Sequence, residues 1–131
     1  KQFPKGAGLN VTSHNISHQR TDYEQWSTYS RFLVEQHAWF LERLNSVEEG
    51  AGTLLDNTMV LYGSCTSQTH VASNYPLILA GGSNLGIKHG QYRQFSEEIP
   101  LSNLYLTMLQ KMGVPVDSFK DSTGSMPEIL S

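Results

Sequence analysis

Two histidines that lie four residues apart are the residues of this sequence best suited to chemistry. The segment His14-Asn15-Ile16-Ser17-His18 carries an imidazole at each end and a hydroxyl group beside the second. If the segment is helical, His14 and His18 lie on one face and could share a metal ion. The same spacing also fits a hydrogen-bonded loop before a helix, and spacing alone favours that alternative. A metal site here needs a further ligand from a distant part of the chain.

The best candidate for that further ligand is His70. It ends the segment Gly63–His70, which is rich in hydroxyl side chains and follows an apolar run typical of a strand. Open α/β sheets bind ligands beyond the carboxyl ends of their strands, so we expect Ser64, Cys65 and Thr66 to contact a substrate there. Alternatively, the hydroxyl groups only satisfy the loop's own backbone, as serine and threonine often do. Both interpretations are open at this point.

Two other features resemble functional motifs less closely. Cys65 is the single cysteine, and the sequence shows no partner that would activate its thiol, so a small buried side chain is a better expectation than a nucleophile. The run Gly81-Gly82-Ser83-Asn84 lacks the lysine and the spacing of a phosphate-binding loop, so we expect a turn.

Two helices are predicted to position these residues. Thr21 and Glu24 form a capping box, and apolar side chains then recur at three- and four-residue steps as far as Leu44. The acidic, glycine-containing stretch that follows ends this helix. A second helix begins at Pro100 and ends before Gly113, which is placed for a C-cap.

Two short apolar runs, Thr58–Tyr62 and Pro76–Ala80, predict strands that are covered on both faces. With the helices they indicate an α/β fold built on a mostly parallel sheet flanked by helices. Two strands do not close such a core, so its edges need further strands. We expect these from the remainder of a parent protein or from a second chain.

Size and charge limit the remaining possibilities. The 131 residues fit one subdomain, with irregular arms at 1–11 and 116–131. The chain starts at Lys1 with no segment typical of a signal peptide, so we expect a processed product, an excised domain or a fragment. A net charge of −3 disfavours a nucleic-acid partner, and no apolar window reaches the roughly 18 residues of a membrane span.

Several segments, taken in order, resemble one protein family. They are the His14–His18 element, the long aromatic helix, Leu54–Ser64, Thr69-His70, Asn74–Gly82, Leu104–Val114 and Asp121–Gly124. In this order they resemble the C-terminal portion of an uncharacterised bacterial family with an H-x-x-S-H-H signature (domain of unknown function 1552). The resemblance covers nearly the whole chain from His14 onward. It departs from the signature at Gln19, where the family has its last histidine.

The resemblance implies a fold and a ligand set. The family looks related to exported proteins with an alkaline-phosphatase or sulfatase-like fold, in which an Asp-x-x-x-His pair, an Asp-His after a strand and a later His bind metals. On that comparison His14 and His18 match the first spacing, with His in place of Asp, and His70 stands for the later His. Residues 63–65 occupy the place of the Asp-His and lack both ligands. The nucleophile of that superfamily would lie outside this chain.

Two functions follow as expectations. The first is an exported, metal-dependent hydrolase of phosphate or sulfate esters, or of related polysaccharide substituents, with His14, His18 and His70 as ligands of a divalent ion. Zinc, calcium and iron are not distinguished. The second is a non-catalytic structural or binding domain whose histidines hold loops together. Members of the family are typically exported by the twin-arginine route, which implies the periplasm or the cell surface for either function. A thiol enzyme that uses Cys65 ranks below both.

Overall fold

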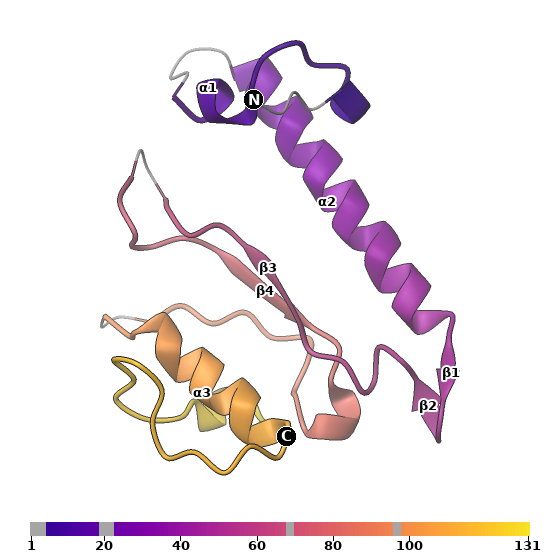
Figure 1. Ribbon diagram of the computed structural model, residues 1–131, viewed down its shortest axis with the longest axis vertical. Helices are drawn as coiled ribbons and strands as arrows, with labels where there is room; N and C mark the ends of the chain where they lie inside the picture. Colours follow the sequence, from indigo (N-terminus) through magenta and orange to yellow (C-terminus); the bar gives the residue numbers. More distant parts are fainter. Residues whose placement is uncertain (1–4, 19–22, 68–69, 96–97) are drawn as a thin grey trace. The chain divides into compact units, whose positions relative to one another are not determined.

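The computed structural model describes residues 5–18, 23–67, 70–95 and 98–131 (Figure 1). Its elements are, in chain order, η1 Lys5–Ala7, α1 Ser13–His18, α2 Tyr23–Asn45, β1 Glu48–Glu49, β2 Gly52–Thr53, β3 Val60–Gly63, β4 Leu77–Ala80, η2 Ser83–Leu85, α3 Leu101–Lys111 and η3 Pro127–Ile129. They form two compact units. The first unit comprises Lys1–Leu44 and Leu61–Ile78, and the second comprises Asn45–Val60 and Leu79–Ser131. That residues 1–131 act as one subdomain of a larger protein stays a prediction.

Helix α2 confirms the long helix predicted from the repeat of apolar side chains. It is described from Tyr23, whereas the predicted cap Thr21 lies outside the described residues. It ends at Asn45, and the chain then turns at Gly50 (φ 60°) so that β1 and β2 pair antiparallel. None of the described helices is long and apolar enough to cross a membrane.

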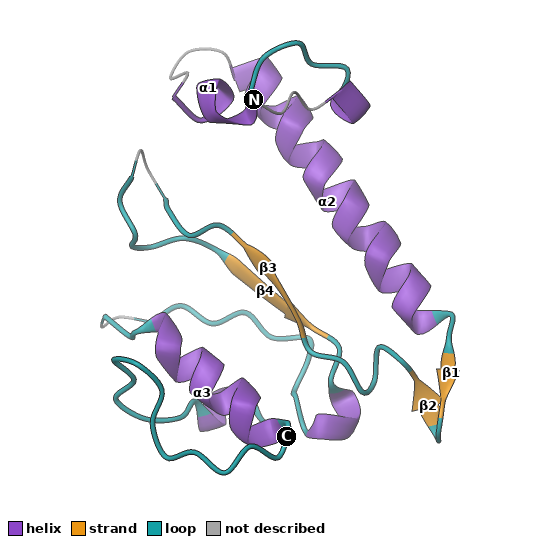
Figure 2. Ribbon diagram, viewed as in Figure 1, coloured by secondary structure: helices purple, strands orange, loops and turns teal. Residues whose placement is uncertain are grey.

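The mixed α/β class is confirmed, but strands β3 and β4 pair antiparallel rather than parallel (Figure 2). Gly63 at the end of β3 is in close contact with Leu77 at the start of β4, whereas Gly81 after β4 is in close contact with Thr58 before β3. Parallel neighbours need a crossover connection, usually a helix. The described part of the connecting segment 64–76 contains no helix and returns as a long hairpin loop. The parallel order predicted for these two runs is therefore not the one they adopt.

Helix α3 begins and ends where the sequence predicts. Pro100 is its N-cap, and Gly113 follows its C-cap with a φ of 79°. The N–H of Gly113 donates to the carbonyl of Gln110, and the N–H of Val114 donates to the carbonyl of Leu109. This pair of bonds is a Schellman motif, which satisfies carbonyl groups that the helix leaves open and requires a left-handed residue at the glycine.

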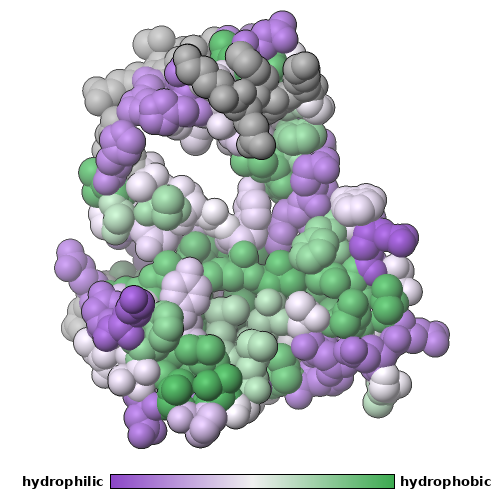
Figure 3. All heavy atoms as spheres, viewed as in Figure 1, coloured by the Kyte–Doolittle hydropathy of each residue, from purple (hydrophilic) through white to green (hydrophobic). Residues whose placement is uncertain are grey.

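The core of the second unit lies around α3. Its buried apolar side chains are Ile87, Leu104, Leu106 and Met126. Residues 116–131 have little regular structure, yet they fold back over the helix, because the N–H of Met126 donates to the buried Thr107 hydroxyl at 2.8 Å. The polar face of α3 is thus covered by the chain's own C-terminal segment. Some apolar side chains of this unit still reach the surface, where they form green areas over the α3 region in Figure 3.

Candidate functional site

Residues 13–18 form a short helix, α1, which settles how His14 and His18 are placed. Thr12 caps it: its hydroxyl accepts from the N–H of Asn15 at 3.2 Å, and its carbonyl accepts from the N–H of Ile16 at 3.0 Å. Ile16 is fully buried and anchors the helix. On a helix, residues four apart share a face. His14 and His18 therefore lie together on the exposed side of α1.

The first unit also brings His70 to this pair. The ring centroids of His14 and His18 are 4.6 Å apart, those of His18 and His70 are 5.2 Å apart, and those of His14 and His70 are 6.4 Å apart. We call these three residues the histidine trio. All three side chains are exposed. Two of them come from α1 and the third comes from the loop between β3 and β4, more than fifty positions later in the chain.

Two of the ring separations in the histidine trio, 4.6 and 5.2 Å, are close to those of a shared ligand set, and the third, 6.4 Å, is larger. Zinc–nitrogen bonds of about 2.0–2.1 Å and tetrahedral angles put the centroids of coordinating imidazoles about 5 Å apart. Among the described residues, however, no group of three or more His, Cys, Asp or Glu is arranged to hold a metal ion. Because χ2 of histidine is a broad torsion and these rings are exposed, rotation of the side chains changes the direction in which the nitrogens point.

The hydroxyl groups near His70 bond to the loop's own backbone. The Ser64 hydroxyl accepts from the N–H of Thr66 at 3.2 Å, and the Ser67 hydroxyl donates to the carbonyl of Val71 at 3.4 Å. Cys65 is exposed, so the expectation of a buried thiol is wrong. Substrate contacts by Ser64, Cys65 and Thr66 stay a prediction, and the local bonds are the alternative that the sequence left open.

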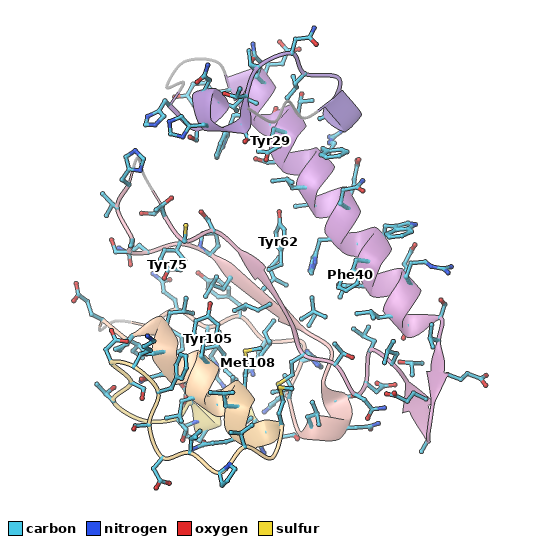
Figure 4. All side chains as sticks on the ribbon, viewed as in Figure 1. Tyr29, Phe40, Tyr62, Tyr75, Tyr105 and Met108 are labelled. Carbon is cyan, nitrogen blue, oxygen red and sulfur yellow. The ribbon has the colours of Figure 1, made fainter. Side chains whose placement is uncertain are left out.

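A stacked aromatic pair lies elsewhere in the first unit. His37 belongs to the apolar stripe of α2, and its ring stacks on Tyr62 of β3 with centroids 4.5 Å apart and an interplanar angle of 18°. Figure 4 shows Tyr62 projecting from the strand. The Nε2 atom of His37 is buried and has no hydrogen-bond partner among the described residues. The sequence did not indicate that these two rings would meet.

The second unit contains a polar cluster, the Asp56 clasp, that sequence reasoning did not find. The Asp56 carboxylate accepts from the Ser83 hydroxyl at 2.5 Å and from the N–H and hydroxyl of Thr53, both at 2.8 Å. Beside it, the Asn84 amide donates to the side-chain carbonyl of Asn57 at 3.0 Å. These bonds, led by that from Ser83, hold the pKa of Asp56 below its usual value. The clasp explains why residues 81–84 form the predicted turn and not an anion-binding loop.

Replacing Asp56 by asparagine is expected to lower the melting temperature most at neutral pH. Because the pKa of Asp56 is lowered on folding, its carboxylate stabilises the fold above the unfolded-state pKa of about 4, and this contribution is lost as the pH falls through the folded-state value. The melting temperatures of wild type and Asp56→Asn should therefore converge on acidification, as measured by circular dichroism from pH 7 to pH 3. The control is Asp117→Asn, which alters an exposed acid. A pH-independent gap between wild type and Asp56→Asn would contradict the explanation.

Comparison with known proteins adds no relative to these observations: no family model, no curated protein and no solved structure matches this chain.

Proposed function

We propose that the chain binds one divalent transition-metal ion through His14, His18 and His70. The single observation that carries the proposal is the separation of the three rings, 4.6 to 6.4 Å between centroids. Side chains so distant in sequence gather at one exposed place only if the fold brings them there. Exposed imidazoles do not attract one another strongly enough to explain this by themselves.

The chemistry of the donors favours zinc or iron over calcium. Imidazole nitrogen is a good ligand for transition metals, whereas calcium binds about six to eight oxygen atoms. The histidine trio offers nitrogen atoms and no oxygen ligand. Three imidazoles leave at least one coordination position open, which is the pattern of catalytic zinc sites and not of closed structural ones. The exposure of all three rings leaves that position accessible to a small molecule.

We further propose that the site serves the hydrolysis of phosphate or sulfate esters in the parent protein. A bound divalent ion supplies Lewis-acid polarisation of an ester oxygen. In this chain α1 holds His14 and His18 at a fixed spacing, and the loop that carries His70 sets the third position. The Ser64 and Thr66 hydroxyl groups, close to His70 in the sequence, would orient the substrate.

The resemblance to the exported H-x-x-S-H-H family supports this part of the proposal. Under it, the chain is the C-terminal part of an alkaline-phosphatase-like fold, located in the periplasm or at the cell surface. The β3–β4 ribbon is a two-stranded sheet with unpaired edges among the described residues. Strands from the remainder of the parent protein or from a second chain would complete it.

A non-catalytic exported binding domain is the second candidate, and one observation favours it. The Ser64 and Ser67 hydroxyl groups already bond to the backbone of their own loop. A hydroxyl engaged in this way is less available to a substrate, so the loop would then serve to hold His70 in place.

The experiment that tests the proposal is a cobalt(II) and zinc titration of the 131-residue chain. We expect one ion per chain and, for cobalt, the visible absorption of a four- or five-coordinate site. No stoichiometric binding would overturn the metal site. Because the expected nucleophile lies outside these 131 residues, hydrolysis of 4-nitrophenyl phosphate and 4-nitrophenyl sulfate is assayed with the metal-loaded parent protein, where binding without hydrolysis would favour the non-catalytic candidate.

A further inference from the structure

An open surface cavity of about 340 Å³ lies beside α2, and its described lining consists of three exposed residues, Ser27, Thr28 and Arg31. Spacings of three and four residues put these side chains on the same side of the helix, so their polar ends reach one space. None of the three belongs to the histidine trio. The cavity is therefore a second candidate site within the first unit.

The side chains of the cavity include two donors without a partner. In the described part of the chain, the Arg31 guanidinium makes no hydrogen bond or ion pair, and the Thr28 hydroxyl makes no hydrogen bond. The Ser27 hydroxyl, in contrast, donates to the carbonyl of Glu24 at 3.0 Å. Among the described lining residues, the groups left for a ligand are thus a fixed positive charge with five N–H donors and one hydroxyl group.

We propose that this cavity binds a small phosphate or sulfate ester by its anionic end. The planar guanidinium of Arg31 offers two parallel N–H groups to two oxygens of a tetrahedral anion, and the Thr28 hydroxyl donates to a third. The cavity lies at the lower end of the range for small-molecule sites, about 300–1,000 Å³, and exceeds what a free ion needs. An organic group attached to the anion therefore fits as well. This inference goes beyond the metal site and does not require a bound metal.

Two acids limit the affinity of this cavity. Glu24 and Glu35 lie on the same helix as Arg31, so this stretch carries two negative charges and one positive charge. Long-range attraction of an anion is therefore absent, and binding depends on short-range contacts. We expect a dissociation constant of about 1 mM at an ionic strength of about 0.1 M.

The test is a titration of metal-free chain with inorganic phosphate, sulfate, 4-nitrophenyl phosphate and acetate, followed by amide chemical shifts at constant ionic strength. We expect Arg31→Gln to weaken phosphate binding at least about tenfold and Thr28→Val to weaken it about threefold. The phosphate affinity of Arg31→Lys should lie between those of wild type and Arg31→Gln, because lysine keeps the charge but lacks the two parallel N–H groups of the guanidinium. The ester should bind at least as tightly as the free ion.

Two controls keep the inference distinct from the proposed metal site. Arg43→Gln removes the same charge about 18 Å further along α2 and should leave phosphate binding unchanged. His14→Ala/His18→Ala should also leave it unchanged, so a chain that binds no metal can still support this inference. Unaltered binding in Arg31→Gln, loss of binding in the double histidine variant, no saturable binding by wild type, or acetate binding as tight as phosphate binding would each overturn it. If Arg31→Gln does not fold, Arg31→Lys decides.

Discussion

Replacing both His14 and His18 by alanine is expected to weaken zinc binding at least about a hundredfold. Loss of groups that only orient a metal ligand typically costs 10- to 100-fold in affinity, roughly, and this variant removes two of three direct ligands. Alanine is a good helix former and Ile16 still anchors the segment, so α1 should persist. Competition with a chelating dye measures the affinity, and circular dichroism checks the fold.

The matched control for this prediction is His89→Gln. His89 belongs to the second unit, where its Nε2 atom lies 2.8 Å from the carbonyl of Gly81, and glutamine keeps a polar group there. This variant should bind zinc as wild type does, whereas His70→Ala should weaken zinc binding, because it removes one of the three proposed ligands. Equal affinities in wild type and the double variant would mean that the trio is not the metal site.

Leu106→Ala is expected to lower the free energy of unfolding of the second unit by about 2–5 kcal/mol, the usual range for truncating a leucine in a core. Leu106 is 1% exposed, and the irregular C-terminal segment packs around its helix, so the lost side chain leaves a cavity. Small domains are stable by only about 5–15 kcal/mol, which makes this a large fraction of the total. The measurement is a urea titration that follows the amide signals of α3.

The readout matters because the chain forms two units. Both tryptophans, Trp26 and Trp39, belong to the first unit, so tryptophan fluorescence does not report on α3. The control is Met112→Ala at the end of the same helix, where the side chain is 68% exposed and the expected change is within about 0.5 kcal/mol. A Leu106→Ala chain as stable as the Met112→Ala chain would show that the second unit does not depend on this core.

Helices α2 and α3 were predictable because their signals are local. The repeat of apolar residues placed α2, and Pro100 with Gly113 placed both ends of α3 within a residue. Capping depends on groups within one turn of the helix, so neighbouring residues are sufficient to specify it. The two apolar runs located β3 and β4 to within two residues, whereas the short strands β1 and β2 were not predicted. The pairing direction of β3 and β4 was not predictable, because an apolar run has the same pattern in parallel and antiparallel sheets.

The buried polar residues of the second unit could not be predicted from the sequence, for a different reason. Asn103 and Thr107 lie on what the pattern of apolar residues marks as the outer face of α3, yet both are buried. Their partners, Thr123 and Met126, lie in a segment whose composition indicates only an irregular arm. A hydrogen bond between residues 19 or 20 positions apart leaves no periodic trace in the sequence. The same holds for the bond between Asp56 and Ser83.

The candidate site, too, was predictable only where its residues are close in sequence. The amino-acid sequence alone determined that His14 and His18 would share a face if the segment became helical, because an α-helix has about 3.6 residues per turn. Only the tertiary structure decided that the segment is helical and that His70 lies within 5.2 to 6.4 Å of both rings. It also decided that the cavity at Arg31 is open and its cation unpaired in the described part of the chain. Contacts between distant segments depend on how loops close and cores pack, and these are properties of the folded chain as a whole.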